Sequence, residues 1–232
     1  MCIDRVARLF LFCVSCLACF SSSVSRDVLG GTGCSRMAAQ LGASVSSADD
    51  PTPPQSPVKL IFIHHSTGEG WLGDGHGQLG ITLRDNNYFV SDTNYGWGPD
   101  DADSGGGTIG DHTDLGHWYN WFSGPNRDTY TNALYIEGSQ NCEYSRLASD
   151  PGGQNQIIMF KSCFPNSHLG GSPGDPVPPI NSNPLRGQDS SSEFHTIANA
   201  KGIYVELLNY FASRLDKLFI VITAPPLLSS GT

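Results

Sequence analysis

Residues 59–71 read Lys59-Leu-Ile-Phe-Ile-His-His-Ser-Thr-Gly-Glu-Gly-Trp71, an apolar run that leads into a small hydroxyl residue followed by glycines. This run predicts a strand over residues 59–64, and such an unbroken apolar run is typical of a strand buried on both faces of a parallel sheet. A serine at the point where this strand turns into a helix has its Oγ exposed at the carboxyl end of the sheet, where ligands bind in open α/β folds. Ser66 is therefore a candidate nucleophile, although an ordinary helix N-cap serine gives the same pattern.

Three further apolar runs predict strands, and one long amphipathic segment predicts a helix. The strands are expected over residues 88–92, 156–161 and 218–223, and the helix over residues 192–216. A strand, a crossover helix and a second strand form a unit with parallel pairing. The sequence therefore predicts an α/β domain with a mainly parallel sheet that begins near Val58. The long segments 93–155 and 164–191 are rich in Gly, Asp, Asn and Pro, and we expect them to be loops that form the walls of a cleft.

The composition and the amino-terminal residues restrict the class of protein. The 232-residue chain has a formal net charge of −9 and no basic cluster, which argues against a nucleic-acid partner. Residues 1–25 contain Arg5 and Arg8 followed by an apolar run, which predicts a signal peptide and export to the periplasm or the cell exterior. Residues 26–57 have the Ser/Pro-rich composition of a linker. We expect no peripheral anchoring to a membrane.

The cysteines leave one question open. Only Cys142 and Cys163 lie within the predicted domain, and they either form one disulfide or remain two separate thiols. Residues 58–232 contain no Cys-x-x-Cys pair and no His/Cys cluster with zinc spacing. We therefore expect no metal site and no cofactor.

Three separated blocks of the domain resemble the SGNH (GDSL-like) hydrolases, a family of esterases, lipases and carbohydrate deacetylases. His64-His-Ser-Thr-Gly-Glu-Gly70 is similar to the block that holds the family's serine nucleophile, with His65 in place of an aspartate. Gly107-Thr-Ile-Gly-Asp-His-Thr113 is similar to the second block and Ile157–Ser167 to the third, which is longer here and lacks an aspartate. The resemblance implies a flavodoxin-like three-layer α/β/α sandwich over residues 58–232.

The resemblance also implies a set of catalytic roles. Ser66 would be the nucleophile, and the backbone N–H of Ser66, the backbone N–H of Gly110 and the side-chain amide of Asn166 would stabilise the oxyanion. The family's base lies in a carboxy-terminal Asp-x-x-His block, which has no counterpart before Thr232. We therefore expect a fragment that lacks the last strand and helix and is weakly active or inactive alone. The alternative is a base from elsewhere in the chain, for which His112 and His168 are the best candidates.

Aromatic residues in the long loop region suggest the substrate. Trp97, Trp118 and Trp121 are candidate substrate-binding residues, because sugar rings stack on such faces, although aromatic residues in loops also act as packing anchors. The sequence therefore predicts an exported serine esterase or deacetylase that acts on a small-molecule or glycan ester. Two alternatives remain: a non-catalytic carbohydrate-binding module on the same fold, and an acyltransferase with the same triad.

Overall fold

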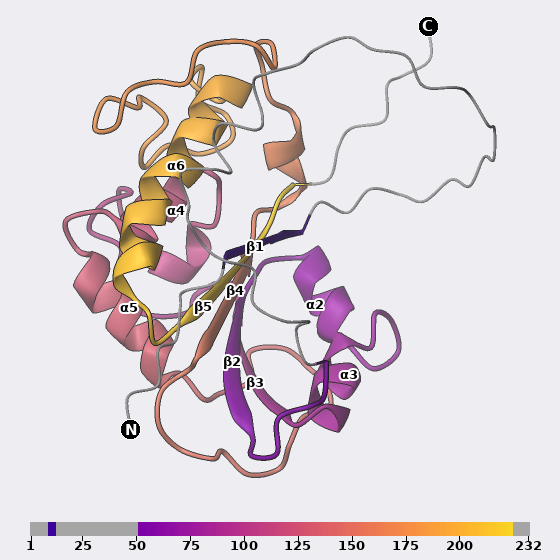
Figure 1. Ribbon diagram of the computed structural model, residues 1–232. Coiled ribbons are helices and arrows are strands. Elements are labelled where there is room, and N and C mark those ends of the chain that lie inside the picture. The colour runs from indigo at the N-terminus through magenta and orange to yellow at the C-terminus, as the bar shows by residue number, and fades with distance from the viewer. Residues whose placement is uncertain (1–8, 13–50, 225–232) are drawn as a thin grey trace, which may run out of the picture. The chain divides into compact units, whose positions relative to one another are not determined.

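Five parallel strands form one sheet in the computed structural model, which describes residues 9–12 and 51–224 (Figure 1). The strands occur in the order β1-β5-β4-β2-β3, and every neighbouring pair is parallel. The four strands predicted within the domain are confirmed to within one residue at each end. The strands are β1 (Leu9–Phe12), β2 (Val58–Ile63), β3 (Tyr88–Thr93), β4 (Ile157–Lys161) and β5 (Leu218–Ile222).

The strand order creates a switch point between β2 and β4. After β2 the chain moves outward to β3 and then returns across β2 to β4, which is the flavodoxin-like arrangement. In such sheets ligands bind outside the carboxyl ends of the two strands at which the direction of winding reverses. Ile63 pairs with Phe160 at this end, so that His64 and Lys161 come next at the same edge. The sheet thus directs attention to the turn that follows β2.

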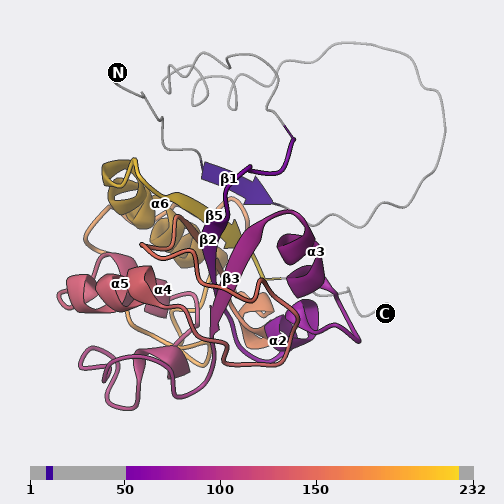
Figure 2. The same ribbon diagram turned by 90° about the horizontal axis from the view of Figure 1, so that it is seen from below.

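Helices cover both faces of the sheet, which confirms the predicted three-layer α/β/α architecture (Figures 1 and 2). Side chains alternate along β2: Ile61 and Ile63 belong to one apolar core, and Leu60 and Phe62 belong to a second core on the opposite face. The first core is covered by α4 (His117–Phe122), α5 (Arg127–Ile136) and α6 (Ile197–Ser213), and the second by α2 (Thr67–Leu72) and α3 (Leu79–Asp85).

Helix α6 is the crossover helix that the sequence predicts, although it is shorter than the expected range of 192–216. It begins where Thr196 acts as the N-cap, because the Thr196 side chain accepts a hydrogen bond from the Asn199 N–H at 3.2 Å. Ile203, Leu207 and Phe211 lie four residues apart and pack together into the first core. The helix is therefore fixed by one cap and one apolar face.

The prediction that residues 93–155 form a loop is wrong for part of that segment. It contains α4, α5 and the 3-10 helix Ile109–Asp111. Trp118, Trp121 and Phe122 of α4 are fully buried against the sheet, and their packing stabilises a helix that is only six residues long. By contrast, the segment 164–191 contains only the short 3-10 helix Phe164–Ser167 among its described residues, as expected for a loop.

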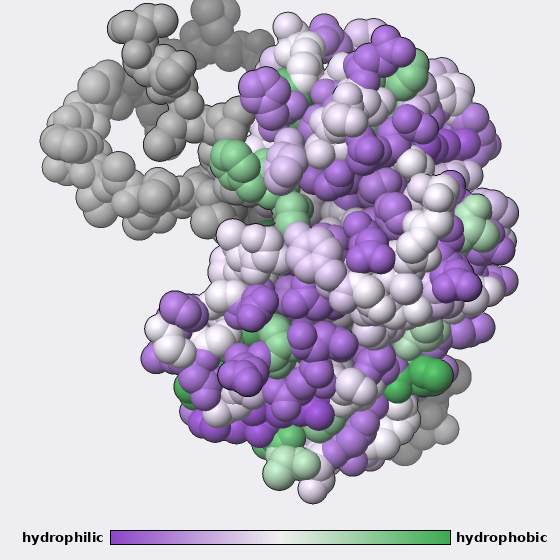
Figure 3. All heavy atoms as spheres, turned by 180° about the vertical axis from the view of Figure 1, so that it is seen from behind, coloured by the Kyte–Doolittle hydropathy of each residue, from purple (hydrophilic) through white to green (hydrophobic). Residues whose placement is uncertain are grey.

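Most of the amino-terminal segment lies outside the described residues. Of the predicted signal peptide only residues 9–12, which form β1, are described. Of the predicted linker only residues 51–57 are described; they contain no helix or strand and are mostly exposed. Among the described helices, none has the length and apolar character needed to cross a membrane. On the face shown in Figure 3, hydrophobic side chains are scattered among polar ones.

Candidate active site

Ser66 has a strained backbone conformation at the carboxyl end of the central strand β2. Its φ is 46° and its ψ is −109°, and the Gly68 N–H donates a hydrogen bond to the His65 carbonyl at 3.0 Å. This is close to the first central position of a type II′ turn, which glycine normally occupies. A side chain other than glycine in such a region costs about 1–3 kcal/mol, and such residues cluster at active sites. The sheet thus holds an exposed serine in an unfavourable conformation at the switch point.

The turn leaves several polar groups free around Ser66. Within the described part of the chain, the Ser66 hydroxyl and the backbone N–H groups of Ser66 and Thr67 have no hydrogen-bond partner. Gly68 is needed at its position because a Cβ there would overlap the imidazole of His64. Free N–H groups at the nucleophile and at the residue after it are the type of donor that stabilises an oxyanion.

Gly110 does not supply a free donor. Its N–H donates to the Trp97 carbonyl at 2.8 Å, and its own carbonyl accepts a hydrogen bond from Nε2 of His65. A Cβ at Gly110 would come to 2.6 Å from the carbonyl oxygens of Asn94 and Trp97. The glycine therefore permits close packing of the loop against the end of β2, and the structure gives it this role in place of the predicted oxyanion contact.

Asn166 is likewise occupied by other groups. It is fully buried, and its Oδ1 accepts from the Leu115 N–H at 2.8 Å. Its Nδ2 donates to Oδ1 of Asp114 at 2.5 Å and to the Cys163 carbonyl at 3.3 Å. The amide therefore ties the turn after β4 to residues 114–115, and no donor remains for an oxyanion in this conformation.

The three tryptophans predicted to bind substrate are core residues. Trp97, Trp118 and Trp121 are all buried, and their indole N–H groups donate to Glu137, Ser162 and the His112 carbonyl, respectively. A sugar ring has no access to these faces, so the structure gives them a packing role instead. Tyr95 is an exposed aromatic residue beside His65: it is 62% exposed, and its ring stacks on that of His65 with the ring centroids 3.8 Å apart.

His65 links the end of β2 to the neighbouring loop. Its Nε2 bonds to the Gly110 carbonyl, and its Nδ1 lies 3.0 Å from Oγ1 of Thr113. Burial lowers the pKa of His65, which favours the neutral ring. In the neutral ring Nε2–H donates to the carbonyl and Nδ1 accepts from the Thr113 hydroxyl. His65 is thus a neutral anchor immediately before the strained serine.

Lys161, at the end of β4, is a buried cation without an acidic partner among the described residues. Its side chain is 3% exposed, and Nζ donates only to the Ser162 carbonyl at 3.3 Å. Nζ also lies 5.7 Å from the centre of the Trp71 ring in α2. Burial lowers the pKa of Lys161, and its positive charge acts on His65. A buried, unpaired lysine at a switch point is a typical feature of functional sites.

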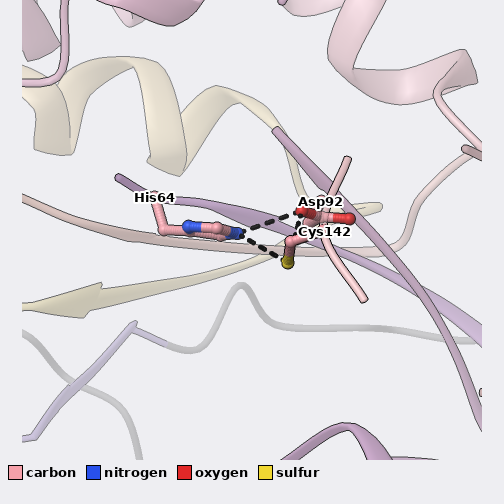
Figure 4. A group of neighbouring side chains, drawn as sticks. All are labelled: His64, Asp92 and Cys142. Atoms are coloured by element: carbon pink, nitrogen blue, oxygen red, sulfur yellow. Dashed lines mark hydrogen bonds and ion pairs between the residues drawn. The ribbon is translucent and has the colours of Figure 1, made fainter. Parts of the chain in front are cut away.

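A second polar cluster includes His64, two residues before Ser66, and consists of His64, Asp92 and Cys142 (Figure 4). Oδ2 of Asp92 is 3.1 Å from Nε2 of His64 and 3.1 Å from Sγ of Cys142. The other carboxylate oxygen accepts from the Asn141 N–H at 2.8 Å and from the Tyr144 hydroxyl at 2.9 Å. These three side chains are the described residues best arranged to hold a metal ion.

The protonation of this cluster follows from its burial. Burial and the Asp92 carboxylate raise the pKa of the Cys142 thiol, which therefore keeps its proton and donates to Oδ2. Nδ1 of His64 is buried and has no partner among the described residues. Cys142 and Cys163 are both free thiols, which answers the question that the sequence left open.

The sequence analysis missed this cluster because its members come from three separate segments. His64 follows β2, Asp92 lies in β3, and Cys142 lies in the segment after α5. Zinc spacing rules detect ligands that are close in sequence. The buried Asp92 at the end of a strand was the available signal, since strand ends in parallel sheets meet at one edge.

The remaining histidines do not reach the serine. Nε2 of His112 bonds to the Gly106 carbonyl at 2.9 Å, and His168 is exposed in the loop after β4. Among the described residues, no histidine forms a hydrogen bond with the Ser66 hydroxyl. No histidine among the described residues can therefore be assigned as the general base.

No protein-family model, curated protein or solved structure matches this chain. Fold and site together define an α/β domain with a strained, exposed serine at the switch point of a parallel sheet.

Proposed function

We propose that the chain is a serine hydrolase of the SGNH-like type that cleaves an acyl ester through Ser66. The observation that carries the proposal is the backbone of Ser66, with φ at 46° and ψ at −109°, at the carboxyl end of β2. A turn that only had to connect β2 to α2 would be more stable with glycine there. The strain is consistent with a hydroxyl that must be presented outward for attack.

In the proposed reaction the Ser66 Oγ attacks the ester carbonyl, and the serine proton passes to a base. The bond between the acyl carbon and the alcohol oxygen breaks, and the alcohol leaves with the proton that the base took from Ser66. Water then hydrolyses the acyl-serine. The free N–H groups of Ser66 and Thr67 stabilise the oxyanion, each with about 3–4 kcal/mol of barrier. The sequence analysis already named the Ser66 N–H as a donor, and we propose the Thr67 N–H in place of Gly110 and Asn166.

Lys161 supports this chemistry by its charge. A buried ammonium without a carboxylate partner among the described residues makes the carboxyl end of β4 electropositive. The end of β4 lies beside the end of β2 in the sheet. A negative charge that develops near Ser66 is therefore favoured, as expected for a site that stabilises an alkoxide or an oxyanion.

The proposed substrate is a small-molecule or glycan ester. The buried tryptophans no longer support sugar stacking, whereas the exposed ring of Tyr95 lies against His65, the residue before the nucleophile. An aromatic face at this place suits the alcohol part of an ester, including a sugar ring. From residues 1–25 we further propose export to the periplasm or the cell exterior, and from the net charge of −9 no nucleic-acid partner.

The test is hydrolysis of a panel of p-nitrophenyl acyl esters and acetylated sugars, with wild type and Ser66→Ala compared. The matched control is Ser172→Ala, because Ser172 is an exposed serine in the loop after β4. Because no histidine of the described residues forms a hydrogen bond with the Ser66 hydroxyl, the proposal expects slow release of the alcohol by wild type and the control, and no release above the spontaneous rate by Ser66→Ala. Equal rates for all three proteins would rule out Ser66 as the nucleophile. Transfer of the acyl group to an added sugar would identify an acyltransferase.

A further inference from the structure

Three side chains from different segments converge on one point. Oδ2 of Asp92 lies 3.1 Å from Nε2 of His64 and 3.1 Å from Sγ of Cys142, and the Nε2 and Sγ atoms are 3.8 Å apart. Three atoms at these separations can all contact one ion at the roughly 2.0–2.3 Å typical of zinc–nitrogen, zinc–oxygen and zinc–sulfur bonds. Figure 4 shows that the three side chains point toward one another from separate parts of the chain.

The charge of the cluster favours a cation. Asp92 is fully buried, and no lysine or arginine forms an ion pair with it among the described residues. A buried carboxylate without a counter-charge is costly, even when donors surround it. One imidazole, one thiolate and one carboxylate are ligands that zinc accepts together.

The surroundings also resemble those of metal sites. The Asn141 N–H and the Tyr144 hydroxyl both donate to Oδ1 of Asp92, which fixes the carboxylate and directs Oδ2 toward the other two ligands. Cys142 is only half-buried and lines a shallow depression formed by residues 140–144, which gives an ion a path from solvent.

From these observations we propose that His64, Asp92 and Cys142 form a binding site for a divalent transition-metal ion of the zinc type. Binding displaces the thiol proton of Cys142 into solvent and moves the ring proton of His64 from Nε2 to Nδ1. The ion joins His64, which follows β2 and lies two residues before Ser66, to strand β3 and to the segment after α5. It acts as a support for the serine turn, and the proposal does not depend on the hydrolase activity.

The test uses zinc content and cobalt absorption of the purified full chain, with Cys142→Ser as the main variant. A serine hydroxyl still donates to Asp92, so that a cluster held by hydrogen bonds alone survives this substitution. Loss of the thiolate removes a zinc ligand and the thiolate-to-cobalt charge-transfer band in the near ultraviolet. The matched control is Cys163→Ser, because Cys163 is the other free thiol in the described chain and lies outside the cluster.

We expect one zinc ion per wild-type chain, release of one proton per ion in weakly buffered solution, and a cobalt charge-transfer band. The control should retain the ion and the band, whereas Cys142→Ser should lose both. Tyr144→Phe removes one donor to Asp92 and should weaken zinc binding by about 10–100-fold. A wild-type chain without stoichiometric zinc after exposure to it would overturn the proposal. A cobalt band of undiminished intensity in Cys142→Ser would also overturn it, because other cysteines of the chain, such as the Cys13-x-x-Cys16 pair, would then be the ligands.

Discussion

Replacing Ser66 by glycine should stabilise the protein while it removes the proposed nucleophile. Ser66 is in a region of φ and ψ that costs about 1–3 kcal/mol for a residue with a Cβ. Glycine removes that cost but adds about 0.5–1 kcal/mol of backbone entropy lost on folding. The hydroxyl is exposed and has no hydrogen-bond partner among the described residues, so that its loss costs little. The net expectation for Ser66→Gly is a gain of about 1 kcal/mol.

The assay is thermal and guanidinium unfolding followed by circular dichroism. A gain of about 1 kcal/mol raises Tm by roughly 2–4 °C in a domain of 150–250 residues. Ser66→Ala is the matched control, because alanine keeps the Cβ and the strain and should leave Tm within about 1 °C of wild type. A Ser66→Gly protein that is no more stable than Ser66→Ala would refute the argument that this turn stores strain.

Three further perturbations test the site and the core. Lys161→Met should raise the free energy of unfolding by about 1 kcal/mol or leave it unchanged, because it removes a buried charge that has no acidic partner among the described residues. The same substitution should slow the acylation of Ser66. A large loss of stability would contradict the interpretation of Lys161 as an unpaired buried charge. Trp118→Ala should lower the free energy of unfolding by about 3–5 kcal/mol in denaturant, whereas Tyr95→Ala should change it by less than about 1 kcal/mol. A loss for Trp118→Ala as small as that for Tyr95→Ala would show that Trp118 is not a core residue. Burial lowers the pKa of His117 to about 4, so that between pH 6.5 and 4 the unfolded chain binds more protons than the folded chain. The contribution of His117 to the free energy of unfolding is therefore fully present above pH 6.5 and should fall by up to about 3 kcal/mol as the pH drops to 4. His117→Asn should flatten this pH dependence, and an unchanged slope would assign it to other groups.

The strands could be predicted because burial on both faces leaves a strong signal. Three of the four runs are almost continuously apolar, and parallel pairing follows from the strand–helix–strand pattern. The short helices were missed for a physical reason. Helix α4 is stabilised by the burial of Trp118 and Trp121, so its formation depends on tertiary packing. The Gly and Asn residues around it give the segment the composition of a loop, and the helix was therefore not recognised from the sequence.

The candidate site was predictable in part. Ser66 could be located because a strand and a glycine-rich turn define its position. The hydrogen-bond partners of Gly110 and Asn166 could not, because a motif identifies a place in the chain and not the groups that pack against it. The cluster around Asp92 could not be predicted either, because it forms only when separate segments come together.

The most direct test of the central claim is fluorophosphonate labelling with mass-spectrometric mapping of the adduct. It should be carried out on the 232-residue chain, with Ser66→Ala as the control. The account predicts an adduct on Ser66 of the wild type. An adduct on another serine, or none, would contradict the assignment of Ser66 as the nucleophile.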